Sequence, residues 1–249
     1  MPKPIHLIEE KGFGIDIEEL KSKLSPKTKL LILNSPHNPT GGMIVRKDIE
    51  DLAEVLRDRD IWVLSDEVYS EMVYEGEFCS IASYPDMKAK TIIIDSFSKT
   101  YAMTGWRLGY GVMDKALAFK VTSLLIQCNS CTPPFIQVAG VEALTGPQNI
   151  LTERFETYRK RRAIIVHGLN QIPGFKCVMP KGAFYAFPNV KALGLPSREL
   201  ALKLLYEAGV ACLPGTVFGR FAEGYLRFTY SNSEPNILEA LERIRQFVK

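Results

Sequence analysis

The segment Thr91-Ile92-Ile93-Ile94-Asp95-Ser96-Phe97-Ser98-Lys99-Thr100 joins a short apolar run to a group of hydroxyl and amine side chains. The apolar part does not alternate with polar residues, which is typical of a strand buried on both faces. Similar runs occupy residues 30–34, 61–65 and 108–113, and a helical pattern covers 46–59. This alternation predicts an α/β fold with a mostly parallel sheet and helices on both of its faces.

After Pro134 the sequence is dominated by longer helical patterns, and the strands become shorter and more widely spaced. We expect helices at 135–144, 150–171, 197–208 and 234–248, with strands at 182–187 and 225–230. We therefore predict two domains. Residues 1–150 form a large α/β domain, and residues 151–249 form a smaller C-terminal α+β domain.

The composition is that of an ordinary globular protein, with 249 residues, 46% hydrophobic residues and a net charge of +3. So small a charge gives no reason to expect nucleic acid or a membrane surface as a partner. No window approaches the roughly 18 consecutive apolar residues of a membrane helix. The five cysteines are scattered, which favours a reduced, cytoplasmic protein, and the three dispersed histidines suggest no metal site.

Polar side chains follow three of the predicted strands, at the point where each strand ends. Asn38 comes after the strand at 30–34, and Asp66 with Tyr69 after the strand at 61–65. Ser96, Ser98 and Lys99 follow the strand that starts at Thr91. In an open α/β sheet, ligands bind at this edge. Three groups of unlike chemistry predict a ligand with several different functional groups.

Lys99 is the candidate nucleophile of this site. A lysine with a pKa of about 10.4 reacts slowly at neutral pH. Desolvation or a nearby cation, such as Arg107, would lower that pKa and activate the amine for Schiff-base chemistry. The alternative is a surface lysine at a strand end. Asp66 needs a cationic partner if it is buried, and an aromatic ring N–H would provide one; otherwise it is a helix N-cap.

Two further groups suggest anion binding. Ser96 and Ser98 alternate about Phe97, so in an extended segment both hydroxyls face one way, and with Arg107 they could bind a phosphate. The alternative is a serine-capped helix start beside an unrelated arginine. Arg227 lies in a strand whose two faces are both largely apolar or aromatic, so its fork of donors suits a carboxylate. A structural salt bridge is the alternative there.

Five segments together resemble the class I and II aminotransferases of fold type I. They are 35–42 (Ser-Pro-His-Asn-Pro-Thr-Gly-Gly), 66–69 (Asp-Glu-Val-Tyr), 96–99 (Ser-Phe-Ser-Lys), 105–109 (Gly-Trp-Arg-Leu-Gly) and 225–228 (Tyr-Leu-Arg-Phe). Their order and spacing match across essentially the whole chain. The resemblance implies an enzyme that moves an amino group between an α-amino acid and a 2-oxo acid, and a homodimer.

The resemblance also implies pyridoxal 5′-phosphate as the cofactor and gives each candidate residue a role. Lys99 holds the cofactor as a Schiff base and later moves the substrate proton, while Asp66 pairs with the pyridine nitrogen. Asn38 and Tyr69 hydrogen-bond the ring 3′-oxygen; Ser96, Ser98 and Arg107 bind the phosphate; Arg227, with Asn38, binds the substrate α-carboxylate.

The sequence departs from the family at its beginning, because the Asn-Pro-Thr-Gly segment starts at residue 38 here and much later in relatives. By resemblance, roughly a third of a usual chain, on the order of 130 residues, is absent. Residues 1–150 would then be a cofactor-binding domain that is incomplete at its N-terminus, and the sequence a truncated form or a fragment. Two alternatives to an aminotransferase stay open: a carbon–sulfur β-lyase or related fold-type-I enzyme, and a truncated chain without activity.

Overall fold

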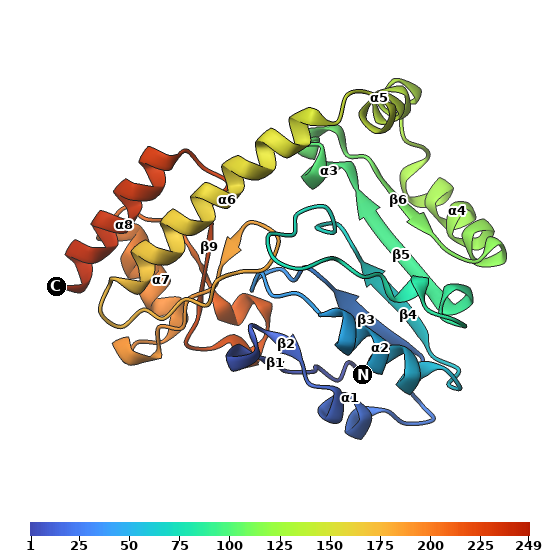
Figure 1. The fold of residues 1–249 in the computed structure, drawn as a ribbon, viewed down its shortest axis with the longest axis horizontal. Coiled ribbons are helices and arrows are strands. Elements are labelled where there is room, and N and C mark those ends of the chain that lie inside the picture. Colours follow the sequence, from blue (N-terminus) through green and yellow to red (C-terminus); the bar gives the residue numbers. More distant parts are fainter. The chain divides into compact units, whose positions relative to one another are not determined.

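The computed structural model describes residues 1–249 and divides them into two compact units (Figure 1). The first unit contains Met1–Ile5, Ile15–Pro36 and Ile44–Thr152. The second contains Glu153–Lys249 together with two short segments from the first half of the sequence, His6–Gly14 and His37–Met43. The loop that carries Asn38 therefore belongs to the second unit and not to the rest of residues 1–150.

The first unit is built on a four-stranded sheet with the order β3-β4-β5-β6. Its strands are β3 (Leu30–Asn34), β4 (Trp62–Asp66), β5 (Thr91–Ser96) and β6 (Gly109–Val112). The first three run parallel, and β6 is antiparallel to β5. The expectation of a mostly parallel sheet is confirmed, and the antiparallel strand lies at one edge.

Five α-helices belong to this unit: α1 (Ile17–Lys23), α2 (Arg46–Leu56), α3 (Phe97–Thr100), α4 (Lys115–Asn129) and α5 (Pro134–Thr145). Helix α1 begins after Asp16, whose side chain accepts a hydrogen bond from the Glu19 amide at 3.0 Å. Helix α2 is amphipathic, and its buried side is formed by residues at helical spacing: Ile49, Leu52, Ala53 and Leu56. Short 3-10 helices at Ile81–Ser83, Lys88–Lys90 and Thr104–Trp106 complete the connections.

The two sides of the edge strand β3 differ in exposure. In β3, Leu33 is 5% exposed, whereas Ile32 beside it is 65% exposed and Leu30 is also exposed. The predicted α/β architecture is present, and on the edge strand β3 one side is more exposed than the other. A continuous apolar run shows that both faces of a strand suit burial, but it does not show that the same 249 residues supply the cover.

Helix α4 was not predicted from the sequence, and it contains no buried residue. Its start is set by Asp114, whose Oδ1 accepts hydrogen bonds from the amides of Ala116 and Leu117 at 2.9 and 3.2 Å. An N-cap aspartate is a readable signal. The amphipathic pattern that usually accompanies it is absent, because no side of α4 packs against this unit's core.

The second unit contains a three-stranded antiparallel sheet with the order β7-β9-β8. The strands are β7 (Tyr185–Ala186), β8 (Leu213–Pro214) and, in the centre, β9 (Leu226–Thr229). Most of α6 (Asn149–Asn170) and all of α7 (Ser197–Tyr206) and α8 (Glu234–Val248) belong to this unit. The remaining strands, β1 (Leu7–Ile8) and β2 (Gly14–Ile15), form a separate two-stranded sheet. None of the helices is both long enough and apolar enough to cross a membrane.

Candidate functional site

The predicted site residues are divided between the two units. Six lie in the first unit: Asp66, Tyr69, Ser96, Ser98, Lys99 and Arg107. The other two, Asn38 and Arg227, lie in the second unit.

In the first unit, the ends of two neighbouring strands bring Asp66 and the start of α3 to the same edge of the sheet. Asp66 is the last residue of β4 and lies opposite Ile94 of β5. Strand β5 ends two residues further on, at Ser96, and α3 with Lys99 follows directly. Because β4 and β5 are parallel, both ends point the same way, as the sequence predicted.

Asp66 is a half-buried carboxylate with one backbone donor. Its Oδ1 accepts a hydrogen bond from the Val68 amide at 3.3 Å. Burial raises its pKa, and the nearby charge of Asp95 raises it further, against the lowering effect of hydrogen bonds. No helix follows, because Ser70 closes a turn by donating to the Glu67 carbonyl at 2.8 Å, so Asp66 is not the helix N-cap of the alternative reading.

Tyr69 lies in this turn and is 3% exposed. The turn is fixed by Glu67, a buried residue that we did not single out from the sequence. Its Oε1 accepts hydrogen bonds from Ser65 Oγ at 2.9 Å and from Ser80 Oγ at 2.6 Å. Burial raises the pKa of Glu67. Nothing in the local pattern identifies Ser80 as its partner, because Ser80 is 13 residues away.

The segment around Lys99 is helical, so the prediction of an extended segment with two parallel hydroxyls is wrong. Ser96 caps α3: its Oγ accepts from the Ser98 amide at 3.0 Å and donates to the Leu108 carbonyl at 3.1 Å. The chain turns at Phe97 because a serine hydroxyl satisfies the first free amide of a helix. Lys99 is partly buried within α3.

Arg107 lies close in space to the beginning of α3. The carbonyl of its neighbour Leu108 accepts hydrogen bonds from both Ser96 Oγ and the Phe97 amide, at 3.1 and 3.2 Å. Arg107 itself is exposed, has a φ of 56°, and donates from Nη1 to the Thr104 carbonyl at 2.9 Å. The structure thus brings a guanidinium-bearing residue beside the Ser96 cap.

In the second unit, Asn38 lies in a tight loop that closes on itself. His37 accepts at its carbonyl from the Gly41 amide at 2.8 Å and donates from its own amide to the Gly42 carbonyl at 2.7 Å. Its ring Nδ1 lies 2.9 Å from Thr40 Oγ1, which accepts from the Gly42 amide at 3.1 Å. Burial lowers the pKa of His37 to about 4. No role was predicted for His37, because the three histidines are far apart in the sequence.

Gly42 allows the loop to approach another backbone segment. A Cβ at this position would lie 2.7 Å from the Cβ of Phe13 and 2.8 Å from the carbonyl oxygen of Gly12. On its other side, the Gly41 carbonyl accepts from the amides of Lys181 and Gly182 at 2.8 and 3.0 Å. The loop is therefore held from two directions within the second unit.

Arg227 and Asn38 are in direct contact. Arg227 donates from Nη1 to Oδ1 of Asn38 at 3.0 Å. Its guanidinium carbon lies 4.6 Å from the centre of the Tyr185 ring and 5.0 Å from that of Phe218. All three contacts are neutral, so they leave the positive charge uncompensated. The structural salt bridge of the alternative reading is not formed.

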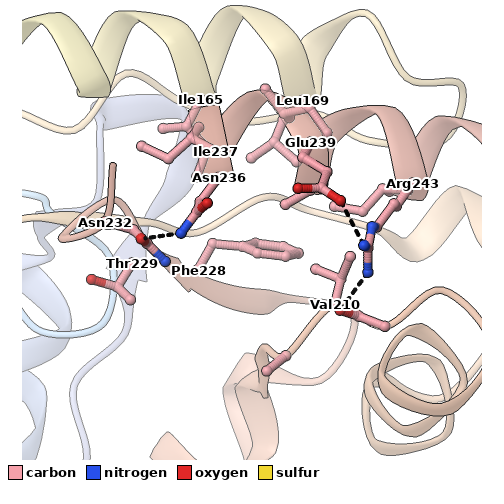
Figure 2. A pocket seen from close by; sticks show the side chains of 15 residues that line it. Ile165, Leu169, Val210, Phe228, Thr229, Asn232, Asn236, Ile237, Glu239 and Arg243 are labelled. Carbon is pink, nitrogen blue, oxygen red and sulfur yellow. Dashed lines mark hydrogen bonds and ion pairs between the residues drawn. The ribbon is translucent and has the colours of Figure 1, made fainter. Parts of the chain in front are cut away.

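The second unit also has a cavity of about 300 Å³ that none of the predicted site residues lines (Figure 2). Its apolar side includes Phe228, the neighbour of Arg227 in β9. The polar groups of its rim pair with each other: Asn236 Nδ2 donates to Asn232 Oδ1 at 2.9 Å, and Arg243 Nη2 lies 2.6 Å from Glu239 Oε1.

The sequence profile of the family described as aminotransferase class I and II matches residues 2–244. The chain therefore belongs to this family. It is 38% identical over 248 residues to a "Putative aminotransferase YugH" of Bacillus subtilis, covering 100% of this chain and 64% of the relative. It is also 38% identical over 251 residues to an "Aromatic-amino-acid aminotransferase 2" of Thermococcus litoralis, with the same two coverages.

Solved structures agree with this assignment. An aromatic aminotransferase from Pyrococcus horikoshii superposes with a TM-score of 0.93 at 38% identity, covering 96% of this chain and 65% of that one. A Thermus thermophilus aspartate aminotransferase variant gives a TM-score of 0.90 at 35% identity, covering 98% and 63%. The predicted α/β fold of type I is confirmed. The chain spans about 64% of the length of the curated relatives that it matches.

Proposed function

We propose that this chain carries the cofactor site of a pyridoxal phosphate-dependent aminotransferase, which moves an amino group between an α-amino acid and a 2-oxo acid. The observation that supports it best is the position of Asp66 and Lys99 at one sheet edge, in a chain of this family. Since the chain spans about 64% of its relatives, activity is proposed for the protein that contains these residues.

The side chains of the first unit offer a suitable group for each part of pyridoxal phosphate. A partly buried amine at Lys99 suits the aldehyde carbon, and the hydroxyl of Ser98 with the guanidinium of Arg107 suits the phosphate. The Ser96 hydroxyl would join them only by giving up its hydrogen bond to the Leu108 carbonyl. The half-buried Asp66 carboxylate, whose pKa is raised by burial, suits a protonated ring nitrogen.

When bound, pyridoxal phosphate supplies an electron sink for negative charge at the substrate α-carbon. The chain's own groups then hold and move protons around it. Asp66 would hold the ring nitrogen in its protonated form, because a carboxylate favours a neighbouring cation. Tyr69 would donate a hydrogen bond to the ring oxygen. Lys99 Nζ would hold the cofactor covalently and, as a free amine, would carry the proton from the substrate α-carbon.

Arg227 binds the substrate α-carboxylate in this proposal. A planar guanidinium offers two parallel N–H donors that match the two oxygens of a carboxylate. The neutral contacts with Asn38 and the two rings orient it and leave its charge available. Substrates without a carboxylate should therefore react poorly.

We further propose that two copies of the protein associate through the surface of α4 and α5. Eight large apolar side chains of these helices are about half exposed or more: Phe119, Leu124, Leu125, Ile126, Phe135, Val138, Val141 and Leu144. Large exposed apolar patches on globular proteins mark interaction sites, among them protein–protein interfaces. Light scattering should give twice the monomer mass, and Phe119→Glu with Phe135→Glu should shift it to monomer. Tyr206→Glu, also at an exposed aromatic, is the control.

A cytoplasmic location is the remaining part of the proposal. All five cysteines are free thiols in the structure, which fits a reducing compartment. Fractionation of the cells that produce the protein, followed by titration of its thiols without reductant, would test this. Recovery of a disulfide-linked form from an oxidising compartment would contradict it.

The central test is a half-reaction with one amino acid and the cofactor-loaded protein. Wild type should show the absorbance of lysine-bound cofactor, and an amino acid should convert it to the aminated form with release of the matching 2-oxo acid. Lys99→Ala should lose both signals, whereas Lys88→Ala, at an exposed lysine, should retain them. Release of ammonia with pyruvate would indicate the lyase instead. Failure of wild type to bind the cofactor would contradict the proposal.

A further inference from the structure

We propose that Tyr185 and Phe218 form an aromatic slot that fixes the plane of the Arg227 guanidinium, and that this slot determines how strongly the protein prefers a carboxylate over a neutral group. The inference deepens the proposed function and rests on it for the identity of the substrate. Tyr185 and Phe218 are positioning residues in this account, since they act through Arg227.

The slot is built from the two elements that flank Arg227 in the sheet of the second unit. Tyr185 lies in β7, on one side of the central strand β9. Phe218 ends the 3-10 helix Gly215–Phe218, which directly follows β8 on the other side of β9. Their ring centres lie 4.6 and 5.0 Å from the guanidinium carbon, inside the roughly 6 Å range of a cation–π contact.

The rings do not depend on Arg227 for their positions. Tyr185 is 6% exposed and packs against the ring of Phe184 at a centroid distance of 4.7 Å. Phe218 meets Phe187 edge to face at 6.5 Å, and Phe187 stacks on Tyr225 at 5.1 Å with an interplanar angle of 4°. The slot is therefore preformed by the aromatic core of the unit, and the arginine fits into it.

The chemistry of the slot favours an anion. Two ring faces and the Asn38 carbonyl oxygen stabilise a cation through partial charges, and none of them neutralises it. A fixed guanidinium plane also reduces the freedom that is lost when a carboxylate binds through two hydrogen bonds. Without one ring, the arginine keeps its charge but can rotate, so carboxylate binding should weaken while binding of an uncharged analogue should not.

The test compares acids with the alcohols of the same shape. Butanoate, 4-methylpentanoate and 3-phenylpropanoate are titrated calorimetrically into the cofactor-loaded protein, together with the three corresponding primary alcohols. Wild type should bind at least one acid more tightly than its alcohol. Phe218→Leu and Tyr185→Leu should each weaken the acid about 5- to 20-fold and leave the alcohol unchanged.

Two controls separate positioning from loss of structure. Tyr185→Phe retains the ring and should retain wild-type affinity for the acid. Phe221→Leu, at an exposed aromatic outside the slot, should behave as wild type. A merely structural effect would weaken acid and alcohol together, and that result would overturn the inference.

The inference and the proposed function can fail independently. If Phe218→Leu binds the acid as tightly as wild type, or if wild type binds no acid better than its alcohol, the slot has no such role, whatever the half-reaction shows. If acid binding depends on the rings but no amino group is transferred, the aminotransferase proposal fails and the slot stands as a carboxylate site.

Discussion

Acidification should loosen the loop that carries Asn38, because the structure holds His37 in its neutral form. Thr40 Oγ1 accepts from the Gly42 amide, so its own hydroxyl proton is free to go to His37 Nδ1, 2.9 Å away. This network assigns the ring proton to Nε2. A proton added at Nδ1 would remove that acceptor and place a charge in a site where burial already lowers the pKa of His37 to about 4.

The size of the effect follows from linkage. An unfolded histidine has a pKa of about 6.5, so the lowered folded value is worth about 3 kcal/mol. The native state binds fewer protons than the unfolded state between these values. The stabilisation is therefore complete above about pH 6.5 and is lost as the pH falls toward 4. Asp66 and Glu67, whose pKa values are raised by burial, act in the opposite direction.

The contributions of Asp66 and Glu67 cancel when wild type is compared with a His37 variant, because both proteins contain these carboxylates. His37→Asn keeps a hydrogen-bond acceptor near Thr40 but does not titrate in this range. The free energy of unfolding of wild type, minus that of His37→Asn, should fall by about 3 kcal/mol between pH 7 and pH 4. By NMR, one of the three histidine ring signals should titrate near pH 4 and be absent from the variant, while exposed His167→Asn retains it. Titration of that signal between pH 6 and 7 would refute the reasoning.

Three further predictions follow from the geometry. Gly42→Ala should destabilise the protein by about 2–4 kcal/mol in urea unfolding, because its Cβ has no space, while Gly105→Ala, with nothing within 4 Å, should cost less than about 0.5 kcal/mol. Affinity for pyridoxal phosphate should fall as the pH drops through the raised pKa of Asp66, since the carboxylate must be charged to bind the ring nitrogen. In absorbance titrations, Asp66→Asn should bind the cofactor weakly and should not show this fall in affinity. Leu33→Ala should cost about 2–5 kcal/mol and Ile32→Ala less than about 1 kcal/mol in the same urea assay; equal losses would show that the exposed sheet face is covered in solution.

The sequence predicted those features that depend on local pattern. The strand at Leu30–Asn34 and the helix at Glu234–Val248 have the predicted bounds, because each is marked by a continuous apolar run or by amphipathic spacing. The meeting of Asp66 and the segment before Lys99 followed from parallel strand ends. In such cases, secondary structure alone decides which residues lie at one edge.

Contacts between distant segments could not be predicted in this way. Asn38 and Arg227 are 189 residues apart, and only the family resemblance placed both beside the substrate. The slot around Arg227 depends on Tyr185 and Phe218. From the sequence, these aromatic residues could equally be interpreted as part of the hydrophobic core. At Ser96 the local pattern was compatible with either an extended segment or a helix cap. The hydrogen bond from Ser96 Oγ to the Leu108 carbonyl, 12 residues away, stabilises the helix cap.

Two charged groups in this chain are poorly explained by folding and well explained by a ligand. In the first unit, Asp66 carries a carboxylate whose pKa is raised by burial, so its charge opposes folding at neutral pH. In the second unit, Arg227 is partly buried among two rings and an amide, none of which neutralises it. A ligand of opposite charge would offset the unfavourable free energy of each buried charge. It would do so only in the native state, because only the folded chain holds these charges in a buried site. Binding a cationic ring nitrogen at one and a carboxylate at the other should therefore raise the free energy of unfolding. The negative charge of Asp66 suits the cationic ring nitrogen, and the positive charge of Arg227 suits the carboxylate of an amino acid. Neither residue alone would indicate this pair of ligands.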